Sequence, residues 1–265
     1  MTCRETTSGN AKYGRAIHNE RPRKQAMNAI EIRDLVKDYG SFRAVKAISF
    51  EVREGEVFGL IGPNGAGKTT TLRIIATLLR VTSGTVTVLG KDLRTEPQEV
   101  RKILSYLPED AGAYKNLTGT EYLEFIANFF ATGAKAEAIV KKGVDIAALA
   151  DRIDDKVDTY SKGMTRRLLV ARALMTDPKL AILDELTSGL DVINAQEIRR
   201  MVKDISTRGM TVLLSSHNML EVELMCDRIA LIDDGRIVEL GTPEELKAKY
   251  GASNIEEVFT RAVKA

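Results

Sequence analysis

Apolar and polar residues follow different patterns along this chain, and each pattern predicts a different kind of element. Residues 29–33 and 45–52 alternate, as strands with one buried face do, and we expect them to pair antiparallel, with residues 85–88 continuing the sheet. Three short runs are almost wholly apolar, which predicts strands buried on both faces. These runs are residues 57–61, 180–183 and 212–214.

Helical spacing replaces these patterns between about residues 111 and 172, where apolar side chains recur three and four positions apart. We assign the aromatic stripe of Phe125, Phe129 and Phe130 within this segment to its core. The end of the chain is predicted to form a helix, a strand and two short helices, at residues 222–225, 229–232, 243–246 and 255–263.

A glycine-rich loop follows the first buried run and leads into an apolar helix. It fits the pattern Gly-x-x-x-x-Gly-Lys-Ser/Thr, in which glycines let successive backbone N–H groups point into one concavity and bind phosphate oxygens. Lys68 is expected to reach the β- and γ-phosphates, and the Thr69 hydroxyl is expected to ligate Mg²⁺. The predicted phosphate-binding residues are Gly62, Pro63, Asn64, Gly65, Ala66, Gly67, Lys68, Thr69 and Thr70.

Further candidate residues lie at the ends of other predicted elements. Ser161 and Gly163 open a helix whose amino end could bind a second anion, although a serine before a helix is commonly only a cap. Asp184 and Glu185 end the second buried run, which would bring the first beside Mg²⁺ and the second beside the γ-phosphate. His217 ends the third run, at the edge where ligands bind in doubly wound sheets.

In this order, the motifs resemble those of the nucleotide-binding subunit of an ATP-binding cassette (ABC) transporter over about residues 29–240. The resemblance implies an α/β fold with a P-loop NTPase core, an antiparallel β subdomain and an inserted helical signature subdomain at about residues 111–172. Residues 62–70 resemble the Walker A loop, residues 161–164 the signature motif, and residues 188–191 the D-loop.

The resemblance also assigns roles to single residues. Glu185 would orient or deprotonate the attacking water, with His217 as the switch histidine and Lys68 completing the catalytic set. Tyr39 is similar to the aromatic residue that stacks on adenine in this family. ATP and Mg²⁺ are therefore the expected ligands, and the expected metal ligands are Thr69, Asp184 and Glu109.

Three motifs depart from the usual family pattern. Glu109 stands where a glutamine is usual, so it can accept hydrogen bonds or bind Mg²⁺ but cannot donate as an amide does. Lys162 and Met164 replace a glycine and a glutamine in the signature motif. Leu186 replaces a proline and restores a backbone N–H. The first two departures resemble the branch of the family that drives drug, polysaccharide or ion exporters.

Composition fits one domain, which we place at residues 27–265. The chain has 265 residues, 44% of them hydrophobic and 29% charged, which is enough for a substantial core. The longest uncharged stretch, residues 209–220, is too short and polar to span a bilayer. Two cysteines without metal spacing predict a reducing compartment, and few aromatic residues with no tryptophan argue against a nucleic-acid partner.

Residues 1–26 hold six basic residues against two acidic ones and no apolar segment typical of a signal peptide. We interpret them as a flexible basic extension, which an upstream start codon would explain, with Met27 as the natural start. An arm that contacts anionic lipid is the alternative.

By resemblance, two such chains pack head to tail as a homodimer or pseudo-dimer, with ATP between one Walker A loop and the other chain's Ser161 and Gly163. A separate multi-helix membrane permease would hold the subunit at the cytoplasmic face of the membrane, where ATP hydrolysis powers transport, with export expected. A soluble ABC ATPase acting on a protein partner would share every motif. The lack of an Asn-Lys-x-Asp or Thr-Lys-x-Asp motif excludes a GTPase, and a structural scaffold would be expected to lack Glu185 or His217.

Overall fold

The computed structural model describes residues 28–264, so the predicted extension at residues 1–26 lies outside the described residues. The strands are β1 (Asn28–Tyr39), β2 (Phe42–Arg53), β3 (Val57–Ile61), β4 (Ser83–Val88), β5 (Lys91–Asp92), β6 (Leu104–Leu107), β7 (Leu180–Asp184), β8 (Thr211–Ser216), β9 (Arg228–Asp233) and β10 (Arg236–Gly241). The helices are α1 (Lys68–Ile75), α2 (Pro97–Arg101), α3 (Gly119–Ala127), α4 (Ala134–Ala147), α5 (Lys162–Leu174), α6 (Val192–Ser206), α7 (Met219–Val222), α8 (Pro243–Tyr250) and α9 (Ile255–Lys264), with 3₁₀ turns at Ala150–Asp154 and Val157–Thr159.

Within the described residues the strands form two sheets. An antiparallel sheet has the order β2-β1-β4-β5, as the alternating segments predicted. The second sheet has the order β10-β9-β3-β8-β7-β6, and its strands from β9 to β6 run parallel. The three predicted buried runs form its strands β3, β8 and β7. Because parallel strands end at one edge, the residues that follow these three strands meet there.

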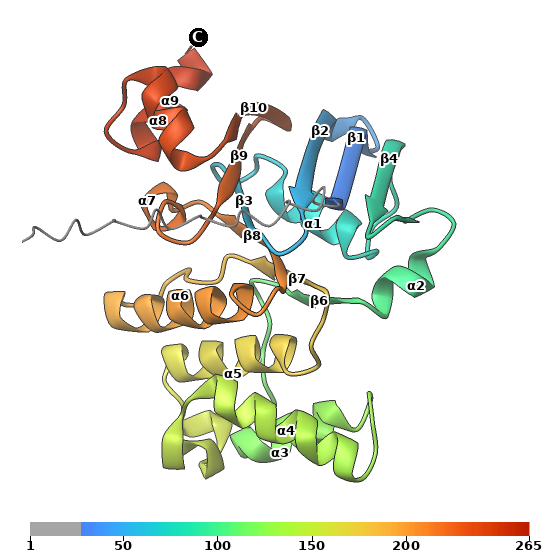
Figure 1. Cartoon of the computed structure of the whole chain (residues 1–265), viewed down its shortest axis with the longest axis vertical. Coiled ribbons are helices and arrows are strands. Elements are labelled where there is room, and N and C mark those ends of the chain that lie inside the picture. The colour runs from blue at the N-terminus through green and yellow to red at the C-terminus, as the bar shows by residue number, and fades with distance from the viewer. Residues whose placement is uncertain (1–27, 265) are drawn as a thin grey trace, which may run out of the picture.

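Each face of the parallel sheet covers an apolar core. On one face Phe58 and Leu60 pack with α1 and the antiparallel sheet, and the rings of Phe50 and Phe58 stack with their centroids 5.4 Å apart. On the other face Ile61 and Leu183 pack with α5 and α6. Figure 1 shows the antiparallel strands at one end of the molecule and helices α3, α4 and α5 at the other. The parallel sheet therefore joins two parts that the sequence patterns distinguish.

The helical segment contains α3, α4 and α5, but the aromatic stripe within it was wrongly assigned to a core. Phe129 and Phe130 are 71% and 65% exposed, and Phe125 is also exposed. The reason is that α3 buries the face that carries Tyr122 and Leu123, and the helix ends at Ala127, before the last two phenylalanines. Helical spacing alone did not show which of two adjacent faces the core would take.

The end of the chain follows the prediction with one shift. Helix α7 covers Met219–Val222 instead of residues 222–225, because the side chain of Asn218 accepts a hydrogen bond from the backbone N–H of Glu221 and caps the helix early. Strand β9 and helices α8 and α9 lie where the sequence placed a strand and two closing helices.

Candidate nucleotide-binding and catalytic site

The glycine-rich loop leaves β3 at the edge where the parallel strands end. Its first N–H, from Gly62, donates to the carbonyl of Ser216 at the end of β8, at 3.3 Å. An added Cβ at Gly62 would lie 2.0 Å from the carbonyl oxygen of Ile232, so no larger residue fits. Gly67 has φ +101° and no side chain caps the helix α1 that follows it. This amino end is therefore available for an anion.

The ammonium of Lys68 is buried within this loop. The side chain is 5% exposed and donates to the carbonyl oxygens of Gly62 at 2.8 Å and Pro63 at 3.1 Å. Its Nζ also lies 3.3 Å from Oε1 of Glu185. The structure thus brings Lys68 and Glu185, two of the three predicted catalytic residues, into direct contact.

The buried carboxylate of Asp184 accepts hydrogen bonds from several hydroxyl groups. It accepts hydrogen bonds from Thr69 Oγ1 at 3.3 Å and Tyr106 at 3.4 Å, and from the hydroxyl of Ser215. Burial raises the pKa of Tyr106 to about 12, although a hydrogen bond with Arg73 opposes the shift. The hydroxyl and carboxylate of Thr69 and Asp184 form an oxygen donor set of the kind that suits Mg²⁺.

Glu185 lies between a lysine and a histidine. Its Oε2 is 2.7 Å from Nδ1 of His217, while its Oε1 faces Lys68. The backbone of Glu185 has φ +48°, a left-handed conformation that is uncommon for a residue with a Cβ. The N–H of Glu185 donates to the carbonyl oxygen of Ser215 at 3.2 Å and to its hydroxyl at 3.1 Å. A buried carboxylate oriented from both sides has the geometry of a general base.

Other predicted site residues lie apart from this cluster. Ser161 caps α5 by accepting from the backbone N–H of Met164 at 3.2 Å, and an added Cβ at Gly163 would lie 2.1 Å from Asn194 Oδ1. Among the described residues, no hydrogen bond or ion pair joins Ser161 or Gly163 to the loop around Lys68.

Tyr39 and Glu109 make no hydrogen bond or ion pair with Asp184 or Glu185 within residues 28–264. Tyr39 is exposed at the end of β1, with Lys37 Nζ 5.0 Å from the centre of its ring. Glu109 is exposed and accepts from the hydroxyl of Ser188 at 3.4 Å, whereas Thr69 and Asp184 contact each other. The third predicted metal ligand, Glu109, therefore does not share a hydrogen bond with Thr69 or Asp184.

Three residues that join the cluster were missed by the sequence reasoning: Tyr106, Arg166 and Ser215. Ser215 pairs in register with Asp184 on the neighbouring strand, so the argument from strand ends could have found it. Arg166 falls at helical spacing from Gly163 and Val170 on the buried face of α5. A charged residue on an apolar face is the signal that could have identified it.

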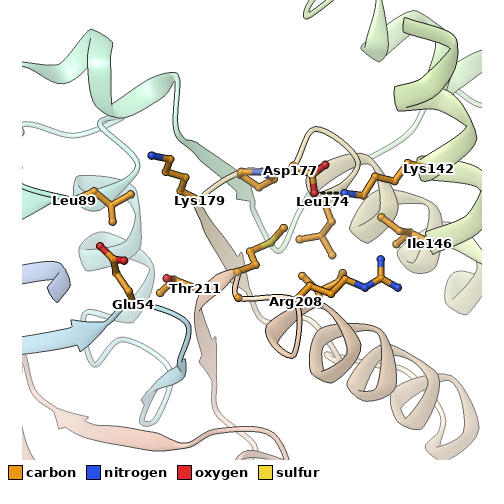
Figure 2. A pocket seen from close by; sticks show the side chains of 13 residues that line it. Glu54, Leu89, Lys142, Ile146, Leu174, Asp177, Lys179, Arg208 and Thr211 are labelled. Atoms are coloured by element: carbon orange, nitrogen blue, oxygen red, sulfur yellow. Dashed lines mark hydrogen bonds and ion pairs between the residues drawn. The ribbon is translucent and has the colours of Figure 1, made fainter. Parts of the chain in front are cut away.

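A separate cavity of about 370 Å³ lies at the opposite ends of the central strands (Figure 2). Lys179 precedes β7 and Thr211 begins β8, so both lie away from the edge that carries Asp184. Lys142 and Asp177 form an ion pair there. None of the predicted site residues lines this cavity, so it is distinct from the nucleotide site.

The fold and the site define a P-loop ATPase cassette. The sequence profile described as "ABC transporter" matches residues 45–188. The chain is 36% identical to the linearmycin resistance ATP-binding protein LnrL of Bacillus subtilis (strain 168), over 89% of this chain and 79% of that protein. It is 40% identical to the daunorubicin/doxorubicin resistance ATP-binding protein DrrA of Streptomyces peucetius, over 86% of this chain and 70% of that protein.

A solved ATP-binding subunit of an ABC transporter has the same fold, with a TM-score of 0.78 and 26% identity over 89% of this chain and 99% of that one. The chain therefore belongs to the ABC transporter family. The predicted fold class, ATP binding and ATPase activity are confirmed. No helix within residues 28–264 is long and apolar enough to cross a membrane.

Proposed function

We propose that this ATPase powers export through a separate membrane permease, as a dimer of cassettes that uses Mg²⁺ and ATP. The observation that carries the catalytic part is the position of Glu185, with Lys68 Nζ at 3.3 Å and His217 Nδ1 at 2.7 Å. Relatives named for drug resistance support export. We place this machinery in one domain at residues 27–265, attached through its partner to the cytoplasmic face of the membrane.

The contacts of Glu185 indicate how the base becomes available. The ammonium of Lys68 contacts one carboxylate oxygen of Glu185 and two loop carbonyls. When Lys68 turns to the β- and γ-phosphates, Oε1 of Glu185 is released and can accept a proton from the attacking water. His217 keeps the other oxygen fixed, so the carboxylate stays oriented. Thr69 and Asp184 would hold Mg²⁺, which supplies positive charge to the phosphate oxygens when bound.

Dimerisation completes the nucleotide site in this proposal. Ser161 and Gly163 begin α5 and make no contact, among the described residues, with the loop around Lys68 in the same chain. A second copy packed head to tail would supply its own Ser161 and Gly163 to this nucleotide, and Tyr39 would stack on the adenine. The γ-phosphate then joins two subunits, and its hydrolysis separates them.

A groove on the helical side offers a place for the permease. Phe129 and Phe130 line it together with Tyr106 on β6, and its volume is about 730 Å³. Arg101 and Arg172 also line it, which favours a cytoplasmic permease helix with an acidic residue among its apolar ones. Because the hydroxyl of Tyr106 contacts Asp184 at 3.4 Å, a helix in this groove would reach the catalytic edge through a single side chain.

Replacing the base tests the catalytic proposal. Glu185→Gln should lower the ATPase rate at least about a hundredfold, since a positioned base contributes roughly that much, and the variant should remain dimeric with ATP and Mg²⁺ on a sizing column. Glu54→Gln is the matched control, because Glu54 is exposed and lines the cavity at the opposite strand ends. Normal turnover by a monomeric Glu185→Gln variant would exclude the assignment. Recovery of the wild-type protein only in the soluble fraction, with a soluble partner, would favour the non-transport alternative.

A further inference from the structure

The guanidinium of Arg166 is buried beside the catalytic edge without full pairing. Arg166 lies on α5 and is 8% exposed. Its Nη2 donates to the backbone carbonyl of Glu185 at 2.9 Å, whereas its Nη1 is buried and has no hydrogen-bond partner among the described residues. Burying an arginine is costly unless its donors are satisfied, so this atom requires an explanation.

Burial lowers the pKa of Arg166, and the carboxylates of Glu109, Asp184 and Glu185 oppose this shift. Ser188 connects Glu109 to the same turn, because its hydroxyl donates to Glu109 at 3.4 Å and its backbone N–H donates at 3.3 Å to the carbonyl of Glu185, which also accepts from Nη2 of Arg166. The carboxylates of Asp184 and Glu185 already have close donors, in Thr69 and Ser215 for the first and in Lys68 and His217 for the second. Glu109 is exposed, and within residues 28–264 its hydrogen bond is the long one from Ser188 at 3.4 Å. Glu109 is therefore the acceptor most able to change partner.

Arg166 also contacts the backbone of Glu185, which has an uncommon left-handed conformation. A left-handed conformation at a residue with a Cβ is unfavourable and persists only when its surroundings hold it. Ser215 holds the N–H of Glu185, and the carbonyl of Glu185 accepts from Arg166 at 2.9 Å and from the backbone N–H of Ser188 at 3.3 Å. The next residue is Leu186, where a proline would have restricted the chain by its ring. The guanidinium is the charged group among those that restrain this turn.

We propose that Arg166 is a positioning residue that links Glu109 to the catalytic base, with Nη2 on the carbonyl of Glu185 and Nη1 donating to the Glu109 carboxylate in the ATP-bound state. The inference rests on the proposed function, in which Glu185 is the base. A guanidinium has a planar fork suited to two acceptors, and an amide or ammonium in its place does not. Glu109 stands where glutamine is usual, and this pairing explains why a carboxylate is useful there.

A four-protein cycle tests the link: wild type, Arg166→Gln, Glu109→Gln and the double variant. Arg166→Gln should lower kcat about tenfold or more, as expected when a base loses its alignment, while the Kd for a non-hydrolysable ATP analogue changes less than about twofold. The double variant should be no slower than Arg166→Gln, because both changes break the same link. Rate losses that multiply, or an affinity loss equal to the rate loss, would overturn the proposal.

The matched control is Arg167→Gln on the same helix. The Nε of Arg167 donates to the carbonyl of Ala147 at 3.0 Å, so this variant loses the same charge without touching Glu185. We expect it to keep kcat, and a loss equal to that of Arg166→Gln would contradict the proposal. If Arg166→Gln does not fold, Arg166→Lys replaces it, because lysine keeps the charge and a donor. Adding Glu109→Gln to Arg166→Lys should then leave kcat unchanged.

Stability supplies a readout that does not depend on turnover. Urea unfolding of the four proteins with saturating ATP analogue should show coupling between the substitutions at positions 109 and 166, and none between 109 and 167. If the wild-type protein binds ATP but does not hydrolyse it, the proposed function fails while this coupling still reports on the link. Additive effects on the midpoint in urea would show that Arg166 and Glu109 do not pair.

Discussion

Lys68→Ala removes a buried ammonium that has three oxygen neighbours. These are the carbonyls of Gly62 and Pro63 at 2.8 and 3.1 Å and the carboxylate of Glu185 at 3.3 Å. These acceptors compete with the phosphate oxygens of ATP for the ammonium, so the phosphate contacts contribute less to the net binding free energy than their full strength. A charge-assisted hydrogen bond contributes about 1.5–3 kcal/mol. Allowing for this competition, we expect a net loss of about 2 kcal/mol, which raises the Kd for ATP roughly thirtyfold.

The same substitution has a second effect, on the protein without nucleotide. Glu185 keeps His217 at 2.7 Å but loses its neighbouring cation. Removing one partner of a buried ion pair costs about 3–5 kcal/mol when nothing compensates. Because His217 remains beside the carboxylate, we expect a smaller loss of about 1–2 kcal/mol in the free energy of unfolding. Urea unfolding without nucleotide measures this separately from binding.

Fluorescence titration with an ATP analogue gives the first quantity, and Lys179→Ala is the matched control. Lys179 is exposed and precedes β7, at the end of the strand opposite Asp184 (Figure 2), so this variant loses the same charge far from the proposed phosphate site. We expect its Kd to equal that of the wild type. A Lys68→Ala protein with unchanged affinity would refute the placement of the phosphates beside Lys68. Equal losses in both variants would show that net charge, and not this contact, controls affinity.

Two further predictions concern the groove and a buried acid. Replacing both Phe129 and Phe130 by Ala should keep basal ATPase activity but weaken binding of the co-expressed permease at least about tenfold in a pull-down, because exposed aromatic side chains contribute much of the binding energy at interfaces. Val263→Ala is the control, since Val263 is exposed on α9. Unchanged permease binding by the double phenylalanine variant would exclude this groove as the docking site. Burial raises the pKa of Glu56 in the folded protein above its ordinary value of about 4.5, although Arg228 opposes the shift. Between the unfolded-state and folded-state pKa values of Glu56, the folded protein therefore binds more protons than the unfolded one. The free energy of unfolding should fall as the pH rises through this window. Glu56→Gln should flatten this part of a urea-midpoint-against-pH curve, and an unchanged slope would assign the dependence to another group.

The sequence predicted the central sheet well because its signals are local and strong. The three apolar runs became β3, β7 and β8, and their polar ends meet because parallel strands finish at one edge. That rule brings Lys68, Glu185 and His217 together from segments far apart in the chain. Motif order added what spacing alone does not contain, namely the role of each residue.

Other features depend on three-dimensional packing and could not be read from the pattern. Phe125 and Phe129 have helical spacing, yet the core accepts the neighbouring face of α3 and the helix ends before Phe129. Tyr106 has no motif of its own and reaches Asp184 only because β6 pairs with β7. The left-handed turn at Glu185 is likewise invisible in a sequence, since glutamate rarely adopts it.

Side chains from three separate segments contact Glu185: Lys68, His217 and Arg166. A movement of any of these segments would therefore change the position of the Glu185 carboxylate. Lys68 comes from α1 and is the residue proposed to bind phosphate, while His217 follows β8. Arg166 comes from α5, on the helical side that carries the groove, and holds the backbone of the acid at 2.9 Å. A shift of α5 relative to the sheet would therefore change the alignment of Glu185 without moving the nucleotide. Control of the rate with little change in ATP affinity is the expected result of this arrangement.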